Sequence, residues 1–221
     1  MWGMCNFMGG GFVRYAVAYR LVAGMQSKKL IAMLKELKTR TIVTPLPVLV
    51  VGTYDKDGVP DAMNVAWGGQ CWDNEIALNI STNHKTTENM RQTHAFTLHI
   101  ADVERMELAD YFGIVSGHDK DKMARVHATT VRGKMVNAPI IEEFVLAMEC
   151  EVVSMTDNGD GGTRVVGKVV RTLADDTIID GDGKVDFTML KPISYDSEHW
   201  TYRPLGESIA KAFSVGKALK G

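Results

Sequence analysis

Short runs of alternating apolar and polar residues, joined by turns rich in glycine and aspartate, constrain the fold of this 221-residue chain most strongly. In EIALNIS, residues 75–81, isoleucine and leucine alternate with polar or small residues, which is typical of a half-buried strand. DKDG at 55–58 favours a tight hairpin between two strand-like runs, because its Asp-Gly pair readily adopts positive φ. NGDGG at 158–162 separates two long β-rich runs in the same way. The pattern predicts six or seven strands, joined mostly by hairpins.

Two segments have a helical pattern. TTENMRQT at 86–93 follows a strand, and DVERMELADYFG at 102–113 has an acidic start and apolar residues at helical spacing. The last segment, 207–221, is predicted to be an amphipathic helix or a tail. Strands and helices do not alternate as in βαβ units. The sequence therefore predicts a mainly β fold, an antiparallel β-barrel with helical insertions.

The first 30 or so residues differ from the rest. Arg14 and Arg20 lie inside the apolar stretch rather than before it, so the segment does not have the order of a signal peptide. We expect residues 1–32 to be an N-terminal extension or a mis-called start. Residues 33–221 contain no linker or internal repeat and are expected to form one domain.

Composition argues against several classes of partner. Lys and Arg total 25 and Asp and Glu total 27, so the net charge of −2 does not indicate a nucleic-acid partner. No apolar run approaches the roughly 20 residues that cross a bilayer, so no membrane partner is expected. Three widely spaced cysteines do not form a disulfide framework, which favours a cytoplasmic location. Metal-binding spacings of His and Cys are absent, so no metal site is expected.

Several well-known catalytic and nucleotide-binding motifs are missing. There is no GxGxxG after a strand, no GxxxxGK[ST] and no GxSxG, which argues against Rossmann, P-loop and α/β-hydrolase sites. DGDGKVD at 180–186 places Lys184 where a calcium loop needs an oxygen ligand, so we interpret it as a turn. No side chain is predicted to act as a catalytic acid, base or nucleophile.

A polar cluster at the start of the first predicted helix is the strongest sign of a binding site. Helix N-termini carry unsatisfied amide donors and a partial positive charge, which suit a phosphate. Lys85 adds a positive charge, while Ser81, Thr82 and Thr86 add hydroxyl donors. The alternative is that Thr86 simply caps the helix. Capping does not explain Lys85, because the helix dipole disfavours a cation at this end.

The strand before the cluster ends in MNVAWGG, residues 63–69, with a predicted turn at Trp67–Gly69. A small residue and two glycines flank the tryptophan, so backbone amides are accessible and a flat ligand can lie against the chain. The alternative is a buried Trp67 with a bulge at the glycines.

These motifs, in this order, resemble a known family. The AMNVAWGG run, the NISTNHKTTENM run and DYFGIVSGHDKDKM at 110–123 are together similar to flavin reductase-like, FMN-binding split-barrel proteins, in particular the flavoredoxin-like branch. The likeness covers roughly Leu37 to Gly206. It implies a Greek-key split β-barrel that binds FMN at the interface of a homodimer.

The resemblance also implies cofactor-binding residues in three groups. Four residues would lie along the isoalloxazine ring: Asn64, Val65, Ala66 and Trp67. Five would hold the phosphate: Ser81, Thr82, His84, Lys85 and Thr86. The loop 116–122 would reach the flavin through Ser116, Gly117 and Lys122, with a solvated charged loop as the alternative. Tyr202 is a further candidate, for which a core or interface aromatic is the alternative.

The implied function is electron transfer from NADH or NADPH through bound FMN to a small-molecule or protein acceptor. Two alternatives remain open at this point. The chain is an electron carrier of the flavoredoxin type without its own nicotinamide site, or a split barrel that binds another ligand and is not an enzyme.

Overall fold

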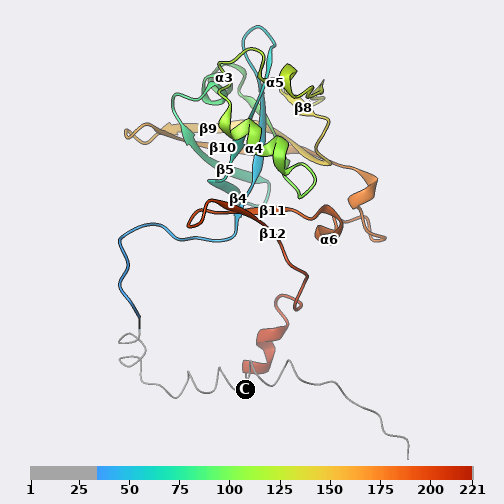
Figure 1. The fold of residues 1–221 in the computed structure, drawn as a ribbon. Helices are drawn as coiled ribbons and strands as arrows, with labels where there is room; N and C mark the ends of the chain where they lie inside the picture. The colour runs from blue at the N-terminus through green and yellow to red at the C-terminus, as the bar shows by residue number, and fades with distance from the viewer. Residues whose placement is uncertain (1–33, 221) are drawn as a thin grey trace, which may run out of the picture. The chain divides into compact units, whose positions relative to one another are not determined.

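The computed structural model describes residues 34–220 (Figure 1). The extension predicted over residues 1–32 lies outside these residues and stays a prediction. The chain divides into two units, Met1–Thr41 and Ile42–Gly221. In the first unit, the described residues 34–41 are exposed and form no helix or strand. The folded structure described below belongs to the second unit.

A large antiparallel sheet dominates the second unit, which confirms the predicted mainly β fold. Its strands occur in the order β3-β2-β6-β9-β10-β5-β4, so β2 pairs with both β3 and the distant β6. The strands span β2 Leu49–Tyr54, β3 Pro60–Val65, β4 Gly68–Trp72, β5 Glu75–Ser81, β6 Ala95–Ile100, β9 Leu146–Asp157 and β10 Gly162–Ala174. The hairpins at 55–58 and 158–162 are as predicted. Strand β4 is a correction, because it begins at Gly68 where a turn was predicted.

Five shorter strands were missed by the sequence interpretation. A three-stranded sheet has the order β1-β11-β12, and β7 pairs with β8. These strands span β1 Leu46–Pro47, β7 Thr130–Arg132, β8 Pro139–Ile141, β11 Ile193–Asp196 and β12 Thr201–Pro204. Runs of two to four residues are too short to show alternation, so only their pairing partners define them.

Both predicted internal helices are present, as α3 Lys85–Thr93 and α4 Met106–Ile114. Shorter helical turns are α5 Lys122–Arg125, α6 Phe187–Leu190, η1 Asp176–Ile178 and η2 Val215–Leu219. Helix α4 lies against β2 and β3 (Figure 1). The C-terminal residues 205–220 are exposed, so the predicted segment there is a tail with one short turn. No helix in the described part of the chain is long and apolar enough to span a bilayer.

Strand β2 is buried on both faces, and this divides the core in two. Leu49 and Val51 belong to the cluster inside the barrel, together with Phe96 of β6. Val48 and Val50 point the other way and pack in a cluster with Phe112 of α4. Successive side chains of a strand alternate between faces, so a single strand supplies both clusters. Helix α4 is thereby fixed over one side of β3.

Close packing and a buried histidine join the strands. A Cβ on Gly167 of β10 would lie 2.4 Å from ring carbons of Phe96, so only glycine fits there. His99 of β6 is fully buried; its Nδ1 lies 3.1 Å from the carbonyl of Val50, and its Nε2 accepts from the amide of Ile141 at 3.0 Å. The neutral imidazole satisfies both contacts. Burial lowers the pKa of His99 to about 4.

Candidate functional site

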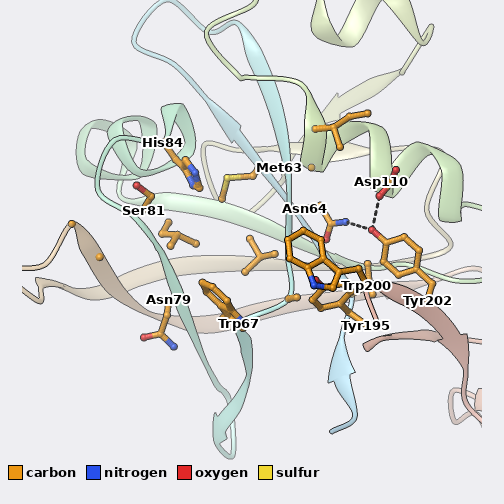
Figure 2. A pocket seen from close by; sticks show the side chains of 18 of the residues that line it. Met63, Asn64, Trp67, Asn79, Ser81, His84, Asp110, Tyr195, Trp200 and Tyr202 are labelled. Atoms are coloured by element: carbon orange, nitrogen blue, oxygen red, sulfur yellow. Dashed lines mark hydrogen bonds between the residues drawn. The ribbon is translucent and has the colours of Figure 1, made fainter. Parts of the chain in front are cut away.

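A cavity of about 930 Å³ lies between the end of β3, the end of β5, α4, the β9–β10 turn and the β11–β12 hairpin (Figure 2). Its volume falls within the roughly 300–1,000 Å³ of small-molecule sites. Its lining residues come from six segments: Val48, Met63, Asn64, Val65, Ala66, Trp67, Asn79, Ile80, Ser81, His84, Asp110, Gly113, Ile114, Asn158, Asp160, Gly161, Gly162, Tyr195, Trp200 and Tyr202. Within this lining the carboxylates are Asp110 and Asp160, and no lysine or arginine contributes.

The bend between β3 and β4 forms one wall. Trp67 is 66% exposed, so the alternative of a buried tryptophan is wrong. The amide of Asn79 donates to the carbonyl of Trp67 at 2.8 Å and fixes the bend against β5. A Cβ on Gly68 would lie 2.6 Å from a methyl carbon of Leu78, so glycine is needed for this close approach. An indole and a backbone bend therefore face the cavity together.

The opposite wall comes from α4 and the β11–β12 hairpin. The hydroxyl of Tyr202 donates to Oδ1 of Asp110 at 2.7 Å and accepts from Nδ2 of Asn64 at 3.5 Å (Figure 2). Burial, and then the bond to Asp110, raise the pKa of Tyr202 to about 12. The sequence interpretation missed Asp110 and Trp200 here, because the packing of α4 on β3 and the pairing of β12 with β11 place them at this wall.

The third side is the turn after β5. Ser81 and His84 line the cavity, but Thr82 turns toward the β9–β10 hairpin. Its amide donates to the carbonyl of Gly161 at 2.9 Å, and its hydroxyl lies 3.0 Å from that of Thr163. Thr82 therefore ties the turn to the hairpin tip, and both form one continuous wall.

Helix α3 begins directly after this turn without a side-chain cap. His84 is its N-cap residue, and its side chain makes no capping hydrogen bond. The alternative that Thr86 caps the helix is wrong, because the buried Thr86 hydroxyl donates to Oδ2 of Asp61 at 3.1 Å. The amides of the first turn thus keep their positive partial charge without a side-chain acceptor. Desolvation, followed by the charge of Lys122 and opposed by Asp61, lowers the pKa of His84.

A second, smaller pocket of about 150 Å³ lies on the far side of β3 and α3. Lys122 is buried beneath it, with Nζ 3.5 Å from Oδ1 of Asp61 and a hydrogen bond to the carbonyl of Phe112 at 3.1 Å. Burial lowers the pKa of Lys122, and Asp61 opposes that shift. The alternative of a solvated loop at 116–122 is therefore wrong for Lys122, although Ser116 is exposed. Lys85 borders this pocket and pairs with Glu88 at 3.0 Å.

The structure thus separates the twelve predicted site residues. Six line the large cavity: Asn64, Val65, Ala66, Trp67, Ser81 and His84. Three line the small pocket: Lys85, Gly117 and Lys122. Three line neither: Thr82, Thr86 and Ser116. Their contacts with a cofactor stay predictions.

Comparisons with known proteins agree with this architecture. A family profile described as "Flavin reductase like domain" matches residues 40–188. The flavoredoxin of Desulfovibrio vulgaris (Miyazaki F) is 33% identical, with a TM-score of 0.78 over 83% of this chain and 100% of that chain.

Two further structures share the fold at lower identity. A flavoredoxin from Methanosarcina acetivorans is 22% identical, with a TM-score of 0.76 over 84% of this chain and 100% of its own. An FMN-binding domain of a flavin reductase-like enzyme from Shewanella baltica OS155 is 17% identical, with a TM-score of 0.65 over 75% of this chain and 88% of its own. The predicted split-barrel fold is confirmed, and the chain belongs to the flavin reductase-like, FMN-binding split-barrel family.

Proposed function

We propose that the chain is an FMN-dependent oxidoreductase that moves electrons from NADH or NADPH to a small-molecule or protein acceptor. One observation carries the proposal: the large cavity joins an aromatic wall at Trp67 to the uncapped start of α3. A planar ring fits against the aromatic wall, and a phosphate fits the start of α3. FMN combines both groups in one molecule.

The donor set of the cavity fits FMN. The first-turn amides of α3 and the Ser81 hydroxyl would donate to the phosphate, and His84 lies beside them. Lys85 and Lys122 lie just behind the turn, at the small pocket, where they pair with Glu88 and Asp61. Bound FMN supplies hydride acceptance from a reduced nicotinamide and release of one or two electrons.

The protein's own part in the reaction is orientation and shielding. Trp67 and the backbone of the β3–β4 bend would hold the ring in place. Trp200 and Ile114 border the same cavity and would limit the access of water to a ring bound there. No residue is required to act as an acid or base in this scheme.

We also propose a homodimer in the cytoplasm. Trp67, Ile114 and Trp200 are 66%, 75% and 83% exposed at the cavity, and apolar side chains grouped in this way favour burial against a second protein surface. A second copy of the chain would cover them and complete the site. Light scattering of the purified protein tests this, and a monomer that holds flavin would contradict it.

The electron-carrier alternative has specific support, namely the 33% identity to a flavoredoxin over that protein's whole length. A visible absorption spectrum before and after anaerobic addition of NADH or NADPH distinguishes a reductase from an electron carrier. Rapid bleaching of a yellow protein supports the reductase. A protein that stays yellow supports the carrier, and a colourless protein that ignores added FMN contradicts both.

A further inference from the structure

The hydrogen-bonded chain from Asp110 through Tyr202 to Asn64 is not explained by cofactor shielding. A tyrosine hydroxyl has one proton, and Tyr202 directs it to Oδ1 of Asp110 at 2.7 Å. Toward Asn64 the hydroxyl can therefore only accept. It takes an N–H of the Asn64 amide, whose Nδ2 lies 3.5 Å away. The carboxylate thus determines which end of the amide faces the tyrosine.

Packing holds α4 and Tyr202 close to Asn64. Helix α4 passes so close to β3 that a Cβ on Gly113 would lie 3.2 Å from the Cβ of Asn64. Tyr202 is itself held by Tyr195, at 6.1 Å between ring centroids, and by the pairing of β12 with β11. Because the pKa of Tyr202 is about 12, the hydroxyl keeps its proton at neutral pH.

The amide oxygen of Asn64 is left for a ligand. Asn64 lines the cavity, and Figure 2 shows its oxygen turned away from Tyr202. Within residues 34–220 this oxygen accepts no hydrogen bond. A carbonyl oxygen can only accept, so it is complementary to an N–H group and not to an unprotonated ring nitrogen or a carbonyl.

We propose that Tyr202 and Asp110 are positioning residues that hold the Asn64 amide with its oxygen toward the cavity, where it accepts from a ring N–H of the bound flavin. The inference rests on the proposed function, since it takes the ligand to be FMN. The pyrimidine part of the flavin carries one N–H in both redox states, and the reduced ring carries more.

A double-mutant cycle on the full chain tests this with a readout other than turnover. FMN dissociation constants are measured by quenching of flavin fluorescence for wild type, Tyr202→Phe, Asn64→Leu and the double variant. Tyr202→Phe should weaken FMN about three- to tenfold, the size of one net hydrogen bond. In the Asn64→Leu background the same change should have no further effect, because Tyr202 acts through Asn64.

Two more variants sharpen the result. Asp110→Leu leaves Tyr202 in place but frees its proton to donate to the oxygen of Asn64, so it should weaken FMN as much as Tyr202→Phe. Tyr54→Phe removes a tyrosine hydroxyl at the end of β2, away from the cavity lining, and should leave affinity unchanged. Melting temperatures of the flavin-free proteins check that each variant folds.

The outcomes are distinguishable. The positioning role alone is overturned if Tyr202→Phe leaves the affinity for FMN unchanged. It is also overturned if Tyr202→Phe weakens FMN equally in the wild-type and the Asn64→Leu backgrounds. A wild-type chain that binds no FMN overturns the proposed function and this inference with it.

Discussion

The large cavity and the small polar pocket share β3 and the start of α3, yet they use their polar groups in opposite ways. In the cavity, Ser81 and the oxygen of Asn64 face open space and are available to a ligand. Asp61, which lines the small pocket, instead accepts from the Thr86 hydroxyl and pairs with Lys122. Residues that form one motif in the sequence are thus divided between binding and structural support.

The division follows from local geometry. Asp61 and Asn64 are three residues apart on β3 and therefore point to opposite sides of the strand. His84 is the N-cap residue of α3, has an extended backbone and lines the cavity, whereas Thr86 lies within the helix and is buried. Substitutions at either pocket test this division of roles.

The largest expected effect is on the small pocket. Asp61→Ala would leave the buried Lys122 without a counter-charge, and unfolding free energy should fall by about 3–5 kcal/mol, as for other broken buried pairs. Urea denaturation measures the change. Asp119→Ala, which removes the half-buried partner of the exposed Arg125, should leave the midpoint nearly unchanged. A stable Asp61→Ala protein would mean that Asp61 does not support this region.

Acid should weaken the buried contacts of His99 with Val50, Ile141 and Phe144 rather than the cavity. The pKa of His99 is about 4 when folded and about 6.5 when unfolded, so the unfolded chain binds more protons between these values. Stability therefore falls as the pH drops from about 6.5, by about 3 kcal/mol at pH 4 from this residue alone. Urea unfolding at pH 7 and pH 4 should show a smaller acid loss in His99→Gln. If His99→Gln loses as much stability as the wild type between pH 7 and pH 4, the acid sensitivity comes from other residues.

A change at the border tests how separate the pockets are. If Lys85 contributes to phosphate binding, Lys85→Ala should weaken FMN by roughly 1.5–3 kcal/mol, the range for a hydrogen bond to a charged group. Fluorescence titration measures the dissociation constant, with Lys168→Ala on the exposed side of β10 as the control. An unchanged constant would remove Lys85 from the phosphate site and leave it to the small pocket.

The smallest effect concerns two exposed tryptophans at either end of β4. Trp67 borders the cavity, whereas Trp72 is exposed and does not line it. Trp67→Ala should weaken FMN by about 1 kcal/mol through lost ring contact, and Trp72→Ala should not. The same titration measures both. Equal losses of FMN affinity in the two variants would show that FMN does not bind specifically against the β3–β4 bend.

Local patterns predicted the hairpins, the two internal helices and the fold class, because each depends on residues close together in the chain. The partners of the polar side chains could not be predicted in this way. Lys122 looks like part of a charged loop in SGHDKDK, and only the fold buries it against Asp61. Asp110 and Tyr202 are 92 positions apart, and the pairing of β12 brings them together.

The tie between Thr82 and the β9–β10 hairpin has a consequence for the time course of binding. Since the turn and the hairpin tip are already bonded through Gly161 and Thr163, this wall exists before a ligand arrives. A ligand that enters a preformed wall does not wait for a loop to close. Association at this wall should follow a single phase whose rate rises linearly with ligand concentration, without the plateau that a slow rearrangement imposes.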